Sequence, residues 1–414
     1  MRKNIFFYLF FTDIFIMVTP QYLFFLKNIN SLLALDAFIL IGIFSFKSYE
    51  LEILSSYLLE LVSVGIGSTL ATIVCSAFVA LFSTVPRFPF LFTWFVSISI
   101  FPIVHKMIYS YFLRKTPDDK YLVIGKDESV KKVMEEICKL PYSKIKVMNF
   151  VNPDQREIEK ASKNGWKVLI ADPAISRKVD LSKYNVEVSY LPELVERTLK
   201  RIPIEVIEKF RDYYEVTFDQ IKESPAKRIL DIFISVLALI LFSPVIIIII
   251  IGILIEDGRP VIFKQKRVGK DGRTFTIHKF RSMYHEKKKA AKFASQDSHR
   301  ITKMGKFMRP YRFDEIPQFF DILRGVMSVV GPRPEQVEFV NEFSKKIPFY
   351  PYRHKIKPGL TGWAQINYNY AETLEEVKTK LSYDLWYVKN RNLLVDLKII
   401  LQTIETVLWR RGAK

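Results

Sequence analysis

The sequence predicts a multi-domain membrane protein: a four-helix transmembrane bundle, a small Rossmann-like α/β domain, and a mostly α-helical C-terminal domain with a re-entrant membrane helix. Apolar runs fill roughly the first hundred residues, short strand patterns alternate with helical patterns after them, and a fifth apolar block opens the C-terminal part. Hydrophobic residues make up 49% of the 414 positions and charged residues 25%, so the two kinds must be segregated along the chain.

The N-terminal transmembrane domain is predicted at 1–115, with spans at about 4–26, 31–46, 57–82 and 90–113. A helix needs about 20 apolar residues to cross the ~30 Å bilayer core, so an interfacial position for the shorter second run stays open. The first run lacks a small-residue cleavage site, which indicates an anchor and not a removed signal. Arg2 and Lys3 precede the first run and Arg114 and Lys115 follow the fourth, whereas Arg87 stands alone between the third and fourth. Both ends of the bundle are therefore expected in the cytoplasm.

The region 118–201 is predicted as a small parallel α/β domain. Strand patterns occur at Tyr121 to Ile124 and in "IKVMNFV", "WKVLIAD" and "VEVSYL", with helical patterns between them. This arrangement resembles a Rossmann unit, but the turn Gly125-Lys126-Asp127 lacks the GxGxxG pattern of dinucleotide sites. A structural or regulatory module is therefore favoured over dinucleotide binding. The charged segment 202–225 is predicted as a helical linker to a final domain at 226–414.

The fifth apolar block, at about 227–256, is long enough to cross a bilayer, and a simple spanning helix is one interpretation. Two features favour a helix that turns back to the cytoplasmic face. Ser243-Pro244 lies near its middle, where proline removes a backbone donor and serine can bond a freed carbonyl. Cations occur on both flanks: Lys222, Lys227 and Arg228 before the block, and Lys264, Lys266, Arg267, Lys270 and Arg273 after it. Asp231 is one helical turn from Lys227 and Arg228 and could pair with them.

The composition disfavours several classes of protein. Cys75 and Cys138 are the only cysteines, so the chain offers no disulfide framework or cysteine metal site. The five histidines have no zinc-hydrolase spacing. The formal net charge of +19 suits nucleic acid, an anionic membrane surface or a phosphorylated substrate. The membrane segments favour the second and third of these partners over nucleic acid.

Basic clusters recur after the fifth apolar block, in "FKQKRVGKDG", "IHKFRSM", "MRPYRFDEIPQ", "GPRPE" and "YRHKIKPGLTGW", and they indicate a phosphate-rich ligand or an anionic lipid surface. Within them Asp314 and Glu315 are adjacent, so on a helix their side chains would diverge by about 100°. One could attack phosphorus while one or both hold Mg²⁺, with Arg309 and Arg312 keeping the nucleophile ionised. Taken alone, an acidic pair that opens a helix is also a favourable surface feature.

The ordered motifs of the C-terminal part carry a resemblance to a known family. They are KRxxD (Lys227, Arg228, Asp231), Ser243-Pro244, "FKQKRVG", "KFRSM" (Lys279 to Met283), "DEIPQ" (Asp314 to Gln318), "GPRP" (Gly331 to Pro334) and "KPGLTGWAQ" (Lys357 to Gln365). Their order is similar to that of the monotopic phosphoglycosyl transferases, the bacterial sugar transferase family. The preceding membrane helices and Rossmann-like domain resemble its long form. Phe313 and Ile316 depart from the common TDELPQ motif without changing either carboxylate.

The resemblance implies a reaction in which a UDP-sugar gives its phosphosugar to undecaprenyl phosphate and releases UMP. It makes Asp314 the nucleophile, Glu315 an assistant in Mg²⁺ binding or catalysis, and Arg333 a contact of uridine or phosphate. Asp314 and Glu315 are thus the catalytic and metal candidates. The substrate-binding candidates are Lys279, Arg281, Arg309, Arg312, Gln318, Pro332, Arg333, Pro334, Arg353 and Lys357.

The implied setting is a bacterial inner membrane, with the catalytic domain facing the cytoplasm and contacting bilayer lipid. A non-catalytic scaffold that binds nucleotide sugars or lipid stays an alternative. The sequence does not identify the sugar, the polysaccharide pathway or the oligomeric state. A homo-oligomer is one of the states it allows.

Overall fold

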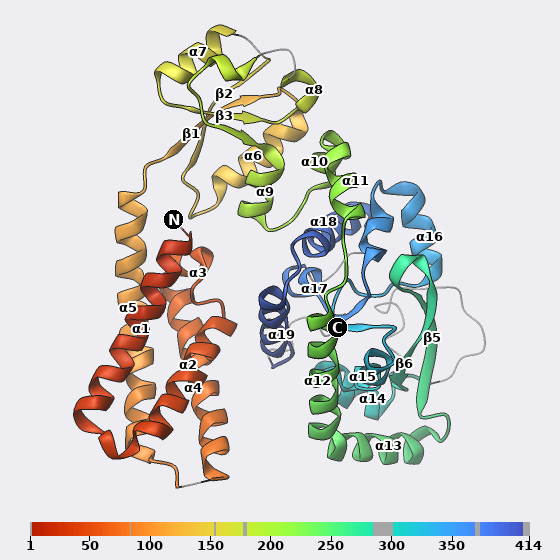
Figure 1. Ribbon diagram of the computed structural model, residues 1–414. Helices are drawn as coiled ribbons and strands as arrows, with labels where there is room; N and C mark the ends of the chain where they lie inside the picture. Colours follow the sequence, from red (N-terminus) through yellow and green to blue (C-terminus); the bar gives the residue numbers. More distant parts are fainter. Residues whose placement is uncertain are drawn as a thin grey trace.

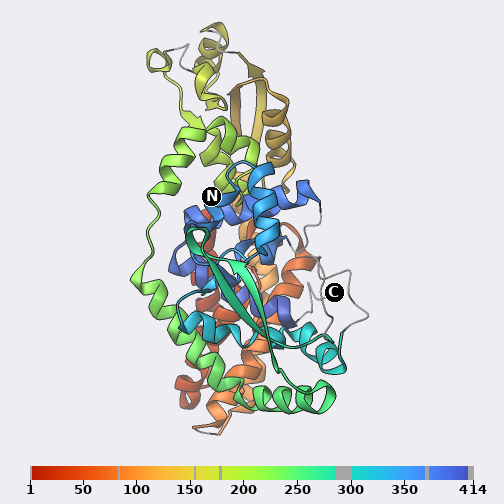
Figure 2. The ribbon, with the colours of Figure 1, turned by 90° about the vertical axis from the view of Figure 1, so that its right-hand side faces the viewer.

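The structure is a computed structural model that describes residues 2–82, 84–152, 155–176, 180–284, 301–368 and 373–408. Figure 1 shows a helical bundle, an α/β part above the end of the bundle where the N-terminus lies, and a C-terminal part beside the bundle. Figure 2 turns the β5–β6 hairpin of the C-terminal part toward the viewer.

The N-terminal part consists of long apolar helices, as expected from hydropathy. The elements are α1 (Arg2–Phe24), α2 (Ile29–Ser45), α3 (Leu51–Ser55), α4 (Tyr57–Ala80) and α5 (Arg87–Lys115). Within the described residues, four unbroken helices are long and apolar enough to cross a membrane: Ile5–Phe24, Leu26–Ser45, Tyr57–Ala80 and Arg87–Lys115. The four predicted N-terminal apolar helices are therefore confirmed as helices, and the short second run reaches 20 residues once the 3₁₀ turn before α2 is included.

A buried polar cluster ties the bundle helices together. His105 on α5 lies with Nε2 2.8 Å from Asp13 Oδ1 of α1 and with Nδ1 2.6 Å from Glu60 Oε1 of α4. The Tyr49 hydroxyl donates to Asp13 Oδ2 at 2.6 Å. Ionisable groups inside a membrane bundle need such partners because no water is present to solvate them. No role was predicted for these residues, which are far apart along the chain.

The middle part contains a small parallel sheet, which confirms the predicted strands. β2, β1, β3 and β4 lie side by side in that order, and every pairing is parallel. The apolar face of the first helix of this part is buried against the sheet through Val130, Val133, Met134 and Ile137. The elements are β1 (Asp119–Ile124), α6 (Glu128–Lys139), β2 (Ile145–Val151), α7 (Gln155–Lys163), β3 (Lys167–Ile170), α8 (Pro173–Ser176), β4 (Val188–Tyr190) and α9 (Leu191–Leu199).

The segment predicted as a linker forms α10 (Ile204–Lys209) and α11 (Arg211–Asp219) and packs tightly. Its apolar residues, including Ile207 and Phe218, belong to one hydrophobic core shared by the α/β and C-terminal parts. The Trp386 indole donates to the Glu196 carbonyl of α9 at 3.1 Å, which adds a polar contact between the two parts.

The C-terminal part is mostly helical, as predicted, with β5 and β6 paired antiparallel and β7 and β8 paired in parallel. Its elements are α12 (Pro225–Leu241), α13 (Ser243–Asp257), β5 (Ile262–Val268), β6 (Thr274–Phe280), α14 (Lys303–Met308), α15 (Gln318–Leu323), β7 (Ser328–Val330), α16 (Val337–Lys346), β8 (Gly359–Thr361), α17 (Trp363–Asn367), α18 (Leu374–Asn390) and α19 (Leu393–Leu408). Thr373 and Glu376 form a capping box at the start of α18.

The fifth apolar block is broken where the sequence indicated. α12 and α13 meet at a bend of 62° at Phe242, with Pro244 in the first turn of α13 (Figure 1). The Ser243 hydroxyl donates to the Ile240 carbonyl at 2.8 Å, as expected for a serine beside a helix break.

The partners predicted for Asp231 are wrong. Its Oδ1 accepts hydrogen bonds from the Ser328 hydroxyl and the Val329 amide, both at 2.9 Å, and is buried at β7. Lys227 pairs instead with Asp396 of α19 at 2.8 Å. Arg228 donates to the last carbonyls of α15, at Ile322 and Leu323, at 2.6 and 2.7 Å. The KRxxD motif thus attaches the start of α12 to the rest of the C-terminal part. The three side chains bond to distant elements and not to one another.

Candidate active site

Asp314 and Glu315 lie in a short 3₁₀ turn, Phe313–Glu315, and not in the α-helix expected from the sequence. The preceding residue, Arg312, adopts the left-handed conformation with φ 56°, which ends the 3₁₀ turn Arg309–Tyr311. A non-glycine residue rarely adopts this conformation, and such strain clusters at functional sites. The break presents the two carboxylates just before α15 begins at Gln318.

Glu315 is buried among cations. Its Oε1 lies 2.7 Å from Lys279 Nζ of β6 and 2.8 Å from Arg333 Nη2, and its Oε2 lies 3.8 Å from Arg312 Nη1. Burial alone would raise the pKa of Glu315, but Arg333, Lys279 and Arg312 hold this pKa well below its ordinary value. Glu315 is therefore a permanent anion that organises the cationic side chains around it.

Asp314 has a different environment from its neighbour. Its side chain is half-buried, and within the described residues its carboxylate receives no hydrogen bond. Burial raises the pKa of Asp314, the charge of Glu315 raises it further, and Lys279, Arg309 and Arg333 oppose the rise. Adjacent carboxylates in unlike environments suit two different roles. Asp314 is the one with oxygens available to a reacting atom.

The loop that places Arg333 beside Glu315 has a tightly packed backbone. A Cβ on Gly331 would lie 2.5 Å from the Lys357 carbonyl oxygen, and one on Gly359 would lie 2.0 Å from the Gly331 nitrogen. Only glycine permits this approach of the "GPRP" and "KPGLTG" segments, which lie side by side because β7, directly before "GPRP", pairs with β8. The Arg333 carbonyl accepts a hydrogen bond from Arg353 at 3.0 Å, which holds the loop from behind.

The structure brings some predicted binding residues to the acidic pair. Three of them, Lys279, Arg312 and Arg333, contact Glu315. The charge of Arg309 opposes the rise that burial causes in the pKa of Asp314. The Arg309 Nε donates a hydrogen bond to the Ser282 hydroxyl at 3.2 Å. Burial lowers the pKa of Arg309.

Gln318 and the prolines flank these residues. The Gln318 side chain is 3% exposed, and its Nε2 has no hydrogen-bond partner in the described part of the chain. Such an orphaned donor is suited to an oxygen of a bound ligand. The Pro332 carbonyl accepts a hydrogen bond from the Gly359 amide at 3.0 Å. The Pro334 carbonyl accepts one from Arg267 Nη1 at 3.4 Å.

Other predicted binding residues lie away from the pair. Arg281 donates to the Asp257 and Gly258 carbonyls at 2.7 Å, where it holds the end of α13. Arg353 is 2% exposed and is bound to Asp384 at 2.8 Å. Lys357 lies 3.6 Å from Glu223. These contacts suit residues that support the site, with Arg353 acting through Arg333.

Arg267, predicted only as one of the cations after the fifth apolar block and not as a binding residue, lies on the site face of the β5–β6 hairpin. Its charge acts on Glu315 and Arg333, and its Nη2 donates to Gln265 at 2.7 Å. In the β5–β6 hairpin, Lys279 lies opposite Phe263, and directly opposed side chains share a face of the sheet. Side chains two and four positions apart on a strand also share a face, so Arg267 lies on the same face as Phe263 and Lys279. This alternation, applied to the predicted hairpin, is the signal that would have found Arg267.

The acidic pair offers donors that suit a magnesium ion bound jointly with a phosphorylated substrate. Mg²⁺ is commonly held by one or two carboxylates together with substrate phosphates and water. Among the described residues, no group of three or more His, Cys, Asp or Glu side chains forms a metal cage. The two carboxylates Asp314 and Glu315 fit this shared mode of binding.

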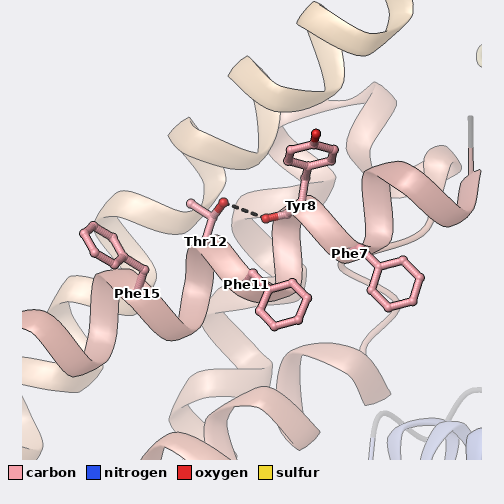
Figure 3. A pocket seen from close by; sticks show the side chains of 5 residues that line it. All are labelled: Phe7, Tyr8, Phe11, Thr12 and Phe15. Carbon is pink, nitrogen blue, oxygen red and sulfur yellow. Dashed lines mark hydrogen bonds between the residues drawn. The ribbon is translucent and has the colours of Figure 1, made fainter.

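A pocket on the outer face of α1 is separate from these groups. It is lined by Phe7, Tyr8, Phe11, Thr12 and Phe15, and the Thr12 hydroxyl donates to the Tyr8 carbonyl within the helix (Figure 3). Its large side chains, such as Phe15 at 69% exposure, form an apolar surface suited to lipid.

Comparison with known proteins matches residues 222–410 to the family described as bacterial sugar transferase. The uncharacterised sugar transferase EpsL of Bacillus subtilis is 38% identical over 186 residues, which cover 45% of this chain and 89% of EpsL. The chain belongs to the bacterial sugar transferase family. The matched region of this sugar transferase contains the acidic pair and the cations around it, together with the α12–α13 bend.

Longer relatives share the same region. The UDP-N-acetylgalactosamine-undecaprenyl-phosphate N-acetylgalactosaminephosphotransferase of Aeromonas hydrophila is 45% identical over 189 residues, 45% of each chain. The UDP-glucose:undecaprenyl-phosphate glucose-1-phosphate transferase of Klebsiella pneumoniae is 44% identical over 181 residues, 43% of this chain and 39% of that enzyme. The match thus spans less than half the length of these two enzymes.

Proposed function

We propose that this sugar transferase is a phosphoglycosyl transferase that moves a phosphosugar from a UDP-sugar to undecaprenyl phosphate. The observation that carries the proposal is the unlike pair at the site: a half-buried Asp314 without a hydrogen bond from any described residue, beside a Glu315 that gathers Lys279 and Arg333. The names of the Aeromonas and Klebsiella relatives support the substrates. The relatives differ in sugar, so the sugar itself is left open.

The reaction proceeds in two displacements at one phosphorus atom. An Asp314 carboxylate oxygen attacks the phosphorus that carries the sugar, the bond to the bridging oxygen breaks, and UMP leaves with the electron pair. A phosphate oxygen of undecaprenyl phosphate then attacks the same phosphorus and displaces the Asp314 carboxylate. The product is undecaprenyl diphosphate sugar, and Asp314 is regenerated.

The surrounding cations stabilise the charge that moves during these steps. Lys279 and Arg333 are fixed within 3 Å of Glu315, so they need little reorganisation to meet the equatorial and leaving oxygens. Arg309 steadies the Asp314 anion from the side of α14. Asp314 and Glu315 would hold Mg²⁺ together with the diphosphate. That ion would neutralise diphosphate charge and favour departure of UMP.

We infer that α12 and α13 form a re-entrant hairpin that enters and leaves on the cytoplasmic side of the inner membrane. The 62° bend, the cations on both flanks and the exposed apolar faces support this, with Ile229, Phe233 and Ile255 at 70%, 64% and 81% exposure. Such a hairpin would hold the site at the surface, where the phosphate of a polyprenyl lipid lies.

Cysteine accessibility in intact cells tests the hairpin. Lys264→Cys, on exposed β5, is made in a chain whose Cys75 and Cys138 are replaced by serine, and it is treated with a membrane-impermeant thiol reagent. Protection until the cells are opened is expected. Leu81→Cys, between the third and fourth spans, is the control that should be labelled from outside. Outside labelling of Lys264→Cys would show that the block crosses the membrane.

The α/β part is proposed as a Rossmann-like module with a structural or regulatory role. The strand order β2-β1-β3-β4 has the reversal at β1 and β3 that doubly wound sheets use as a ligand crevice. The Gly125-Lys126-Asp127 turn at that point lacks the glycines of a phosphate loop, which disfavours dinucleotide binding.

UMP release tests the proposed activity against the alternative of a non-catalytic scaffold. Purified protein is incubated with UDP-glucose, UDP-galactose or UDP-N-acetylgalactosamine, with and without undecaprenyl phosphate and Mg²⁺. An enzyme releases UMP repeatedly only when the acceptor and the metal are both present, and at most once per molecule without the acceptor. A scaffold binds a UDP-sugar and releases no UMP under any of these conditions.

A further inference from the structure

The segment that carries the acidic pair is fastened along strand β6 by two carboxylates. The Glu315 carboxylate forms an ion pair with Lys279 of β6, with Oε1 2.7 Å from Nζ. Six residues after Glu315, the Asp321 carboxylate bonds to His278, the residue before Lys279 on the same strand. Asp321 Oδ2 accepts the His278 backbone amide at 3.0 Å, and Oδ1 lies 2.7 Å from His278 Nδ1. We propose that Asp321 is a positioning residue for the reaction, because it sets the Asp314–Glu315 turn in register with Lys279.

The geometry of β6 explains why a carboxylate is needed there. β5 pairs with one edge of β6, and the His278 amide points to the other edge, where Asp321 meets it. A buried amide without an acceptor is costly, and a carboxylate gives a strong, charge-assisted bond. Asp321 is 1% exposed and its second oxygen is used by the His278 ring, so both oxygens serve the strand.

The C-terminal end of α15, directly after Asp321, is also held by α12. Arg228 of α12 donates to the Ile322 and Leu323 carbonyls at 2.6 and 2.7 Å. The short helix therefore has two fixed points, Asp321 on β6 and its C-terminal carbonyls on α12. The exposed Arg324 lies 3.6 Å from Asp321 and adds little, since solvent screens its charge. Loss of the Asp321 contact frees the catalytic turn to shift relative to Lys279 while Arg228 still holds the helix end.

This inference rests on the proposed function, and it predicts an effect on the chemical step. Asp321 touches neither Asp314 nor the cations that contact Glu315, so its loss leaves substrate affinity nearly unchanged. A displacement of about 1 Å between reacting groups lowers rates by about 10- to 100-fold. Asp321→Ala is therefore expected to slow transfer to Asp314 by about that factor. Asp321→Asn keeps an oxygen for the His278 amide and is expected to stay within about threefold of wild type.

Single-turnover kinetics with a UDP-sugar that wild type turns over provides the test. The rate constant of UMP release reports positioning, whereas the amplitude reports the fraction of folded protein. Asp321→Ala and Asp321→Ser, whose hydroxyl is too short to reach His278, should lower the rate constant with little change in KM. His278→Ala removes only the ring contact and should cost less than Asp321→Ala. Asp219→Ala, an exposed aspartate on α11, is the control and should match wild type.

The outcomes separate this inference from the proposed function. A wild-type protein that never releases UMP contradicts the proposed function itself. An active wild type whose Asp321→Ala and Asp321→Ser variants keep the wild-type rate constant contradicts the positioning role. A loss confined to amplitude, or an Asp321→Asn variant as slow as Asp321→Ala, contradicts it equally.

Discussion

Glu335 follows the "GPRP" motif and fastens the loop that presents Arg333. Its Oε1 lies 2.6 Å from Lys380 of α18, and its carbonyl accepts the Val268 amide of β5 at 3.1 Å. Burial alone would raise the pKa of Glu335, but Lys380, Arg353 and Arg267 lower this pKa from 4.5 to about 2. Because the carboxylate is stabilised in the folded state, Glu335→Gln should destabilise the C-terminal part.

The lowered pKa sets the size of the effect. A difference between 4.5 unfolded and about 2 folded corresponds to about 3 kcal/mol at neutral pH. Glutamine keeps one acceptor for Lys380, so we expect a loss of about 1–3 kcal/mol. For a unit of about 200 residues this lowers the melting temperature by several degrees, roughly 2–4 °C per kcal/mol.

The assay is thermal unfolding of the purified protein, followed from neutral to acidic pH. Because the folded pKa is depressed, the stabilisation is complete above the unfolded pKa of 4.5 and is lost as the pH falls toward 2. The gap between wild type and Glu335→Gln should therefore narrow below pH 4.5. Glu342→Gln removes the same charge from an exposed pair with Lys346 and should change stability by less than about 0.5 kcal/mol. Equal melting temperatures for the two variants at neutral pH would refute the reasoning.

Two further predictions concern the acidic pair. Glu315→Gln releases Lys279 and Arg333 from their shared carboxylate. The affinity for UMP, measured in EDTA, should therefore rise about tenfold, while turnover falls. Unchanged or weaker UMP binding would contradict this. Burial raises the pKa of Asp314, so in protein kept metal-free with EDTA its carboxylate should titrate at a pH above the ordinary value of 3.8, as measured by the difference in proton uptake between wild type and Asp314→Asn. Titration at or below that value would show that Asp314 behaves as an ordinary aspartate.

Local patterns in the sequence predicted the large elements because those elements depend on local physics. Apolar runs located the bundle helices, and apolar strand patterns located the parallel sheet. Ser243-Pro244 located the break between α12 and α13, and even the serine's bond to a freed carbonyl was expected. The acidic pair and three cations that contact Glu315 were likewise selected in advance.

Long-range pairing could not be derived in the same way. Asp231 takes its partners from β7, 97 and 98 residues away, and not from the cations one turn before it. Arg353 was expected at the substrate, yet it is buried against Asp384, because "YRHKIK" does not show which cations face inward. The left-handed Arg312 was not predicted either, since the surrounding fold imposes that conformation on a non-glycine residue.

The central claim is that Asp314 forms a covalent bond to the phosphosugar. Wild-type protein, incubated with a UDP-sugar without acceptor and quenched rapidly, is digested and examined by mass spectrometry. We expect a phosphosugar on Asp314 that is consumed when undecaprenyl phosphate is added. With Asp314→Asn we expect neither the adduct nor UMP. Full turnover by Asp314→Asn, or an adduct on another residue, would contradict the central claim.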